Sequence, residues 1–366
     1  MNRIRIGVLF GGRSSEHAIS CVSAAGVLAA LNPETYDVTA VGITRSGLWR
    51  LFEGPFADLA ISGDALPEVA ELGPAVQLIL DPSAPGFLIE GREVPLDVVF
   101  PVLHGPWGED GSISGLLEIC GIPYVGSGVL ASSAAMDKIV TKTVLAASGL
   151  DVGTWIEVAA GESPSEGAER AVEALGLPVF VKPARAGSSR GISRVGSVAD
   201  LASGIERARH HDPKVIIEAA VIDAREIECG VLMDARGMEV SVCAEIVVTE
   251  GFDFYDFTAK YLSDGADLIV PAQISAELQE RIQSVALAAV TALGCEGLAR
   301  VDFFVTADDR ILVSEVNTMP GFTPISMFPR MFIESGYTFE EIVETLVSEA
   351  LRRPKGLRPS LSRPPQ

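Results

Sequence analysis

Short hydrophobic runs alternate with longer amphipathic stretches in the first third of the chain. Runs that are apolar throughout and end near glycine predict strands buried on both faces, and they lie at 4–10, 38–43 and 98–103. Apolar positions at helical spacing predict helices over 18–31, capped by Ser14 or Ser15, and over 113–120, before a short strand at 122–125. This alternation predicts a doubly wound α/β unit over 1–126, with the proline-, glycine- and acid-rich stretch 51–95 as a surface insertion.

Strands and helices are mixed differently in the rest of the chain. A first α+β unit is predicted over 127–220 from a helix at 132–148, strands at 179–182, 192–195 and 215–218, and a helix at 199–210. A second is predicted over 221–353 from strands at 227–232, 239–248, 297–306 and 311–316 and helices at 276–293 and 339–353. The tail 354–366 is basic and proline-rich, and we expect it to be disordered.

Composition narrows the class of protein. A chain of 366 residues is too long for one core, which agrees with several domains. Its net charge of −21 repels a phosphate backbone, so we expect no nucleic-acid partner. The sequence has no apolar run long enough for a membrane span, and the short apolar run near its start leads us to expect no signal peptide. Five widely spaced cysteines without a CxxC pair fit a reducing compartment. We therefore expect a cytoplasmic protein.

The strongest local signal is a pair of polar motifs on two neighbouring predicted strands: Arg300, Asp302, Glu315 and Asn317. A hairpin that turns at Asp308-Asp309 would pair Asp302 with Glu315 and place all four side chains on one face. Like charges directly opposite each other destabilise a sheet, whereas a cation between them would reverse that. Oxygen ligands suit Mg²⁺, which completes its shell with substrate phosphates. The alternative is a surface hairpin with solvated acids, and the abrupt Gly321 loop that follows favours a site.

Further candidates are loops at strand ends. Lys182 ends a strand, and the run 187–191 supplies backbone donors suited to phosphates, or else is an ordinary Gly/Ser hairpin. Glu16 and His104 follow two parallel strands, at the edge where open α/β sheets bind ligands. The segment 126–131 matches the dinucleotide pattern GxGxxA, but its preceding strand is short and it comes late in the α/β unit. Tyr261 and Lys260 lie in a polar stretch that could close over a site.

The order of these motifs is more specific than any one of them. It resembles the D-alanine–D-alanine ligases of the ATP-grasp superfamily, from about residue 4 to residue 350, through GGxSxEH, HGxxGEDG, GSGxxxSxxxMDK, KPxxxGSS, YDxxxKYL, RxD and ExNTxPGxTxxS. The resemblance implies an N-terminal α/β domain and two α+β domains that clamp ATP. It implies a reaction in which the carboxylate of one D-alanine attacks the γ-phosphate, and the amine of a second D-alanine then attacks the acyl phosphate. The product would serve peptidoglycan synthesis.

The resemblance also assigns roles, motif by motif. For ATP it implies Lys138, Lys182, Ser188, Glu218 beside adenine, Glu226 on the ribose and Lys260 on the γ-phosphate. For two Mg²⁺ or Mn²⁺ ions it implies Asp302, Glu315 and Asn317, with K⁺ as a further candidate ion. For D-alanine it implies Glu16, His104, Arg300 and Ser326. Catalysis would use a latch of Glu16, Ser188 and Tyr261, an oxyanion site of Arg300 and the Gly321 N–H, and Ser326. A homodimer is implied as well.

Two positions and one segment depart from the family pattern. Ala186 stands where glutamate is frequent, and Arg190 where a small apolar residue is common. The segment 219–225 lacks the bulky residue often found beside adenine, so the adenine contacts stay open.

Other functions remain as alternatives. They are a D-alanine–D-lactate ligase or another ATP-grasp carboxylate–amine ligase, a nicotinamide-dependent dehydrogenase built on 126–131, and a non-catalytic nucleotide-binding protein.

Overall fold

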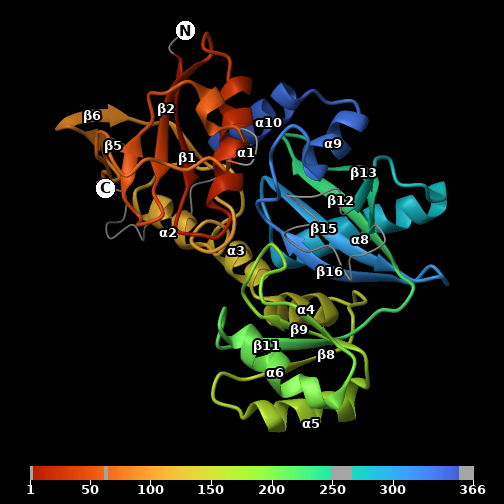
Figure 1. Ribbon diagram of the computed structural model, residues 1–366. Coiled ribbons are helices and arrows are strands. Elements are labelled where there is room, and N and C mark those ends of the chain that lie inside the picture. The colour runs from red at the N-terminus through yellow and green to blue at the C-terminus, as the bar shows by residue number, and fades with distance from the viewer. Residues whose placement is uncertain (1–2, 62–64, 249–265, 354–366) are drawn as a thin grey trace, which may run out of the picture.

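A computed structural model describes residues 3–61, 65–248 and 266–353. Figure 1 shows three bodies, each built around its own sheet, with a small additional sheet beside the first. None of the described helices has the length and hydropathy of a membrane span.

The N-terminal body contains a sheet in the order β3-β2-β1-β7, formed by β1 (Ile4–Gly11), β2 (Tyr36–Ile43), β3 (Trp49–Leu51) and β7 (Val98–Pro101). Strands β1, β2 and β7 are parallel. Side chains of β1 alternate between two buried clusters, with Val8 in one and Leu9 in the other. The sheet is therefore covered on both faces, and the predicted doubly wound unit is confirmed. Helices α1 (His17–Ala30) and α2 (Ser112–Ile119) also lie where they were predicted.

Three local predictions in this body need correction. Helix α1 begins after Glu16, and Ser14 instead accepts the backbone N–H of Glu16 through its hydroxyl. The segment predicted as a strand at 122–125 forms only a single bridge, between Tyr124 and Val99. The stretch 51–95 is more than a surface insertion, because it contains the 3-10 helix Phe56–Leu59 and an antiparallel sheet of β4 (Val76–Leu78), β5 (Gly86–Ile89) and β6 (Arg92–Pro95). Phe87 of that sheet is fully buried.

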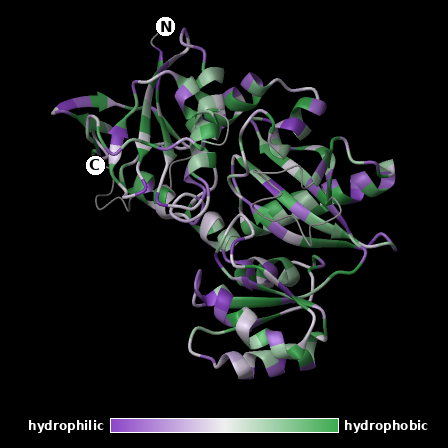
Figure 2. Ribbon diagram, viewed as in Figure 1, coloured by the Kyte–Doolittle hydropathy of each residue, from purple (hydrophilic) through white to green (hydrophobic). Residues whose placement is uncertain are grey.

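The second body has an antiparallel sheet in the order β10-β9-β11-β8. Its strands are β8 (Trp155–Val158), β9 (Val179–Pro183), β10 (Ser193–Val195) and β11 (Val215–Ala219), and its helices are α5 (Pro164–Leu175) and α6 (Val198–Arg209). The sequence interpretation missed β8 and α5. Ser163 caps α5, Pro164 opens it and Gly176 follows it, a combination that is a readable helix signal. Figure 2 shows both apolar and polar segments on α5, as expected for a helix with one face on the core.

The third body is a five-stranded antiparallel sheet in the order β14-β13-β12-β15-β16. The strands are β12 (Arg225–Met233), β13 (Met238–Val248), β14 (Ala266–Ile269), β15 (Leu298–Val305) and β16 (Ile311–Asn317), with helices α8 (Ala276–Leu293), α9 (Met327–Glu334) and α10 (Phe339–Arg352). Four of these strands and two of these helices were predicted. Strand β14 and helix α9 were not.

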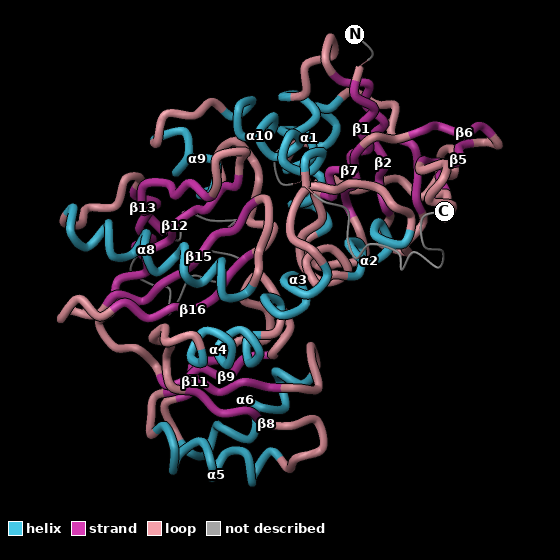
Figure 3. The backbone as a smooth tube through the Cα atoms, turned by 180° about the vertical axis from the view of Figure 1, so that it is seen from behind, coloured by secondary structure: helices cyan, strands magenta, loops and turns pink. Residues whose placement is uncertain are grey.

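The predicted helix over 132–148 is two helices, α3 (Val129–Met136) and α4 (Lys138–Ala147). Asp137 separates them because its extended backbone and its carboxylate cap the start of α4, accepting the N–H groups of Ile139 and Val140. Figures 1 and 3, seen from opposite sides, both place α4 between the second and third sheets. Leu145 belongs to the core of the third body, whereas Ile139 packs near the second.

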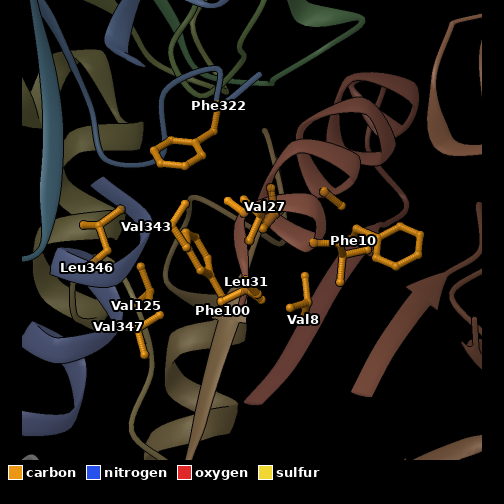
Figure 4. Close-up of a cluster of buried hydrophobic side chains, with 14 of the residues drawn as sticks. Val8, Phe10, Val27, Leu31, Phe100, Val125, Phe322, Val343, Leu346 and Val347 are labelled. Carbon is orange, nitrogen blue, oxygen red and sulfur yellow. The ribbon is translucent and has the colours of Figure 1, made fainter. Parts of the chain in front are cut away.

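The last helix returns to the first body. Helix α10 places Val343, Leu346 and Val347 in the same buried cluster as Val8 of β1 and Phe100 of β7 (Figure 4). The two ends of the described chain therefore share one core. This packing joins residues of the predicted units 1–126 and 221–353 in one cluster, and the division into 1–126, 127–220, 221–353 and a tail stays a prediction.

Replacing Leu346 by alanine should test that shared core. Leu346 is fully buried, so we expect Leu346→Ala to lower the free energy of unfolding by about 2–5 kcal/mol. The control is Leu351→Ala in the same helix, where the side chain is partly exposed and the expected loss is below about 1 kcal/mol. Urea unfolding followed by circular dichroism measures both. Equal losses for the two variants would contradict the docking of α10.

Candidate active site

A cavity of about 390 Å³ lies between the second and third sheets. Phe180, Ile192 and Phe304 contribute apolar side chains to its wall. Six residues predicted to bind nucleotide or metal line it: Lys138, Lys182, Glu218, Glu226, Asp302 and Glu315. They come from α4, from two strands of one sheet and from three strands of the other. The structure thus brings most of the predicted nucleotide site together in one place.

Glu218 is buried between two lysines. Its carboxylate oxygens lie 2.9 Å from Lys182 Nζ and 3.4 Å from Lys142 Nζ. Burial by itself would raise the pKa of Glu218, but the two ammonium groups outweigh it and lower the pKa to about 2. Burial likewise opposes the charged form of Lys182, yet Glu218 outweighs it and raises that pKa. Glu218 is therefore a fixed anion that holds two cations at the cavity.

Lys142 is a participant to which the sequence interpretation gave no role. It is 2% exposed, and burial lowers its pKa. A signal was available, because Lys138 and Lys142 are four positions apart and so share one face of α4. Lys138 Nζ donates to the carbonyl of Ala186 at 2.8 Å and lies 3.5 Å from Glu315. One face of α4 therefore presents two lysines to the cavity.

The hairpin register predicted for the acidic motifs is confirmed. Asp302 pairs with Glu315, and Arg300 pairs with Asn317. The predicted two-residue turn is wrong, since Thr306 and Arg310 bracket a loop of residues 307–309. A bulge after Asp302 shifts the pairing by one residue and compensates for the longer turn. The two departures cancel at the site.

Asp302 accepts hydrogen bonds from one arginine and one asparagine side chain. Arg300 donates to both of its carboxylate oxygens at 2.7 Å, and the Asn317 amide donates at 3.0 Å. Arg300 further lies 3.3 Å from Glu228, a buried acid on β12 that was not predicted as part of the site. Burial would lower the pKa of Arg300, but Asp302 and Glu228 outweigh it and raise it well above its usual value.

The oxygen donors at this hairpin supply only some of the ligands that a hard cation needs. Within the described ranges, no three acidic, histidine or cysteine side chains are grouped closely enough to bind a metal ion by themselves. Two facing carboxylates and one amide suit Mg²⁺, which commonly takes few protein ligands and completes its shell with water and phosphate. The residues thus fit a Mg²⁺ ion whose remaining ligands come from a bound phosphate and water.

Glu16 connects the first body to the serine loop. Ser188 donates its hydroxyl to the Glu16 carboxylate. A β-carbon on Gly105 or Gly187 would come within 2.4 or 2.8 Å of a Glu16 carboxylate oxygen, so a larger residue at either position would displace that carboxylate. Two members of the predicted latch are therefore together. Its third member, Tyr261, lies outside the described residues, as does Lys260.

His104 is buried beside the loop that follows β16. Its Nδ1 lies 3.1 Å from the carbonyl of Met319, and its Nε2 lies 2.9 Å from the hydroxyl of Ser23. Burial would lower the pKa of His104, but Glu109 and then Glu16 outweigh it and raise the pKa. Gly321 lies in the same loop. The loop ends at Ser326, which is the residue directly before α9. The Ser326 hydroxyl accepts the N–H of Thr323 at 3.1 Å.

The GxGxxA segment does not form an open phosphate loop. Its Gly126 carbonyl accepts from Arg353 at 2.7 Å. A β-carbon on Gly297 would lie 3.1 Å from the Gly126 nitrogen, so two backbones are packed together there. The backbone of Gly126 is thus engaged by other parts of the protein, which argues against the dehydrogenase alternative.

Comparison with known proteins gives a consistent picture. Residues 5–127 match the family model described as D-ala D-ala ligase N-terminus, and residues 144–348 match D-ala D-ala ligase C-terminus. A D-alanine--D-alanine ligase from Mycolicibacterium gilvum is 53% identical and covers 97% of this chain and 99% of its own length. The corresponding protein from Frankia casuarinae is 52% identical, with 97% and 98% covered.

Solved structures agree with this. The chain superposes on the VanG D-Ala:D-Ser ligase from Enterococcus faecalis with a TM-score of 0.84 and 36% identity, covering 95% of this chain and 100% of that one. It superposes on the D-alanine-D-alanine ligase from Coxiella burnetii with a TM-score of 0.82 and 31% identity, covering 96% and 95%. The expected ATP-grasp architecture is thereby confirmed.

Substituting Glu218 by glutamine should reveal its linkage to pH. A folded pKa near 2, below the ordinary value near 4.3, means that the carboxylate stabilises the fold above about pH 5 and loses this effect as the pH falls toward 2. We expect Glu218→Gln to cost about 3–5 kcal/mol at pH 7, because two buried lysines lose their anion, and less at pH 3.

Urea unfolding at several pH values measures the difference, and Glu173→Gln on the exposed face of α5 is the control. A difference between wild type and Glu218→Gln that is the same at pH 7 and pH 3 would contradict the assignment.

Proposed function

The chain belongs to the D-alanine–D-alanine ligase family, and from this premise we propose that it joins two molecules of D-alanine at the expense of ATP. The products are ADP, phosphate and D-alanyl-D-alanine, the last for peptidoglycan precursors. One observation carries the proposal. Lysines and carboxylates from motifs far apart in the chain line a single cavity between two sheets, as a phosphate-transferring site requires.

In this proposal ATP occupies that cavity. Lys138 and Lys182 bind its phosphates, with Lys260 on the γ-phosphate. Glu218 and Glu226 bind the adenine and ribose sides, and Ser188 adds a donor from its loop. The support is that four of these residues line the cavity. Lys142 lies 3.4 Å from Glu218, so Glu218 would keep a cation beside it if Lys182 turned toward a phosphate.

Asp302, Glu315 and Asn317 would hold two Mg²⁺ or Mn²⁺ ions, with K⁺ as a further candidate ion. When bound, Mg²⁺ supplies positive charge that neutralises phosphate oxygens. Arg300 holds Asp302 in place through two hydrogen bonds to its carboxylate, opposite Glu315 on the neighbouring strand.

The first D-alanine is bound by Glu16, which accepts its ammonium group, with His104 close by. Its carboxylate attacks the γ-phosphate, so that the bond to ADP breaks and an acyl phosphate forms. The amine of the second D-alanine, whose carboxylate is bound by Ser326, then attacks the acyl carbon and phosphate leaves. Arg300 and the Gly321 N–H stabilise the tetrahedral oxyanion, and one such donor contributes about 3–4 kcal/mol.

Water must be kept from the acyl phosphate. Glu16 and Ser188 are already joined, and Tyr261 would complete the latch that closes the polar loop over the site. We further propose a cytoplasmic homodimer with no nucleic-acid or membrane partner, in keeping with the net charge of −21.

The carboxylate pair is tested by Asp302→Asn and Glu315→Gln. We expect each to lower kcat by about 100-fold or more and to raise the Mg²⁺ concentration needed for half-maximal activity, since each removes an oxygen charge from the shared ligand set. Glu315→Gln is the sharper test because the described hydrogen bonds of Arg300 go to Asp302 instead.

Asp309→Asn is the control on the same hairpin, since asparagine tolerates the left-handed backbone at that position. Normal Mg²⁺ activation in Glu315→Gln would remove the metal assignment.

The reaction itself is tested by phosphate release from Mg·ATP with and without D-alanine, with the product identified by mass. We expect one phosphate per D-alanyl-D-alanine. D-lactate and D-serine are offered in separate reactions, because a depsipeptide enzyme or a D-Ala:D-Ser ligase would prefer them as the second substrate. Phosphate release that does not depend on D-alanine would overturn the proposed substrate.

A further inference from the structure

The loop that carries Gly321 belongs to the third body by sequence but packs on the first. It follows β16, yet the ring of Phe322 is fully buried against Phe100 of β7 and Phe339 of α10, with ring centroids 5.9 and 5.5 Å apart. Figure 4 shows Phe322 close to Val343 in this cluster. A β-carbon on Gly26 of α1 would lie 3.0 Å from Pro324, so α1 and the loop are in close contact. The loop is therefore packed between the first body and helix α10.

Two polar side chains of the first body bind the backbone of this loop. The Phe322 N–H points to the Ser23 hydroxyl at 3.4 Å. His104 bonds the carbonyl of Met319 at 3.1 Å and the same Ser23 hydroxyl at 2.9 Å. Ser23 and His104 are both buried. We call this set, Ser23 with His104, the loop clamp.

The clamp brackets one peptide group. The Met319 carbonyl belongs to the peptide before Pro320, and the Phe322 N–H belongs to the peptide after Gly321. Between them lies the Pro320–Gly321 peptide, which carries the Gly321 N–H. Pro320 has a restricted φ, so fixing both neighbouring peptide planes leaves little freedom in the direction of that N–H.

The Ser23 hydroxyl suits this task whichever form His104 takes. A carbonyl can only accept, so His104 Nδ1 must carry a proton to bond Met319. In the neutral ring Nε2 then has no proton, and Ser23 donates to it. In the charged ring Nε2 donates to Ser23. In both cases the hydroxyl oxygen keeps a lone pair for the Phe322 N–H. Alanine or valine would offer no lone pair, and a carboxylate would have no proton to donate to the neutral ring.

We propose that Ser23, together with His104, is a positioning residue that aims the Gly321 N–H at the oxyanion of the second half-reaction. The inference rests on the proposed function, which supplies the role of Gly321. Because the oxyanion forms when the amine attacks the acyl phosphate, loss of the clamp should slow peptide formation more than acyl phosphate formation. The acyl phosphate would then wait longer and be lost to water or to an added nucleophile.

The test compares Ser23→Ala with Ser20→Ala. Ser20 is also fully buried on α1, and its hydroxyl also makes two backbone hydrogen bonds, to the Gly11 N–H and the Val102 carbonyl, both within the first body. The two variants remove the same atom from the same helix. Of these two serines, only Ser23 bonds to the loop that carries Gly321. Any general loosening of α1 should therefore be similar in the two variants.

Each variant is assayed for ADP, phosphate and dipeptide, and hydroxylamine is added to trap the acyl phosphate as a hydroxamate. For Ser23→Ala we expect dipeptide formation to fall about 10- to 100-fold, the ratio of phosphate to dipeptide to rise clearly above one, and the hydroxamate yield to increase. The KM for ATP should change little. Ser20→Ala should keep a ratio near one.

Equal ratios in the two variants would overturn the proposal, whether both stay near one or both rise. Should Ser23→Ala not fold, Ser23→Cys retains the size of the side chain with a much weaker hydrogen-bonding group, and a wild-type ratio in that variant would overturn it as well. Failure of the proposed function is a separate result, because the wild-type protein itself would then make no dipeptide.

Discussion

Charge compensation in the cavity between the second and third sheets is the constraint on which the rest of the site depends. An unpaired charge in such a place costs several kcal/mol. Accordingly, Lys142 and Lys182 share Glu218, Arg300 is held by Asp302 and Glu228, and Lys138 lies near Glu315. The chain has a net charge of −21, yet it gathers these cations around one cavity, each beside a carboxylate, and this local arrangement suits the binding of a nucleotide.

The first body makes direct hydrogen bonds to loops of the other two. Glu16 reaches the serine loop of the second body through Ser188, and Ser23 and His104 reach the loop after β16. Helix α10 closes the arrangement by packing on the first sheet. The residues proposed to bind the amino-acid substrates are thus spread over several bodies, whereas most of those proposed for phosphate and metal lie between two of them. This separation allows nucleotide binding and amino-acid alignment to be disturbed independently.

Much of the site was predictable because its signals are local. The pairing of Asp302 with Glu315 follows from strand alternation and was predicted correctly, even though the turn was one residue longer than expected and a bulge made up the difference. The break at Asp137 was missed although an aspartate before a helix is a readable cap. Strand β14 was missed because four residues are too few to show an alternating pattern. Its pairing with β13 becomes visible only in the folded sheet.

The sequence by itself determined the family, the order of the motifs and the face on which each chemical group stands, since periodicity and capping act over a few residues. Tertiary structure alone decided which groups share a cavity. Lys142 became the second partner of Glu218 through the packing of α4 between two sheets, and Glu228 joined Arg300 through strand order. Tertiary structure also placed the Ser23 hydroxyl on α1 within reach of the Phe322 N–H. Contacts between segments so far apart in the sequence depend on the complete fold, and no local sequence pattern predicts them.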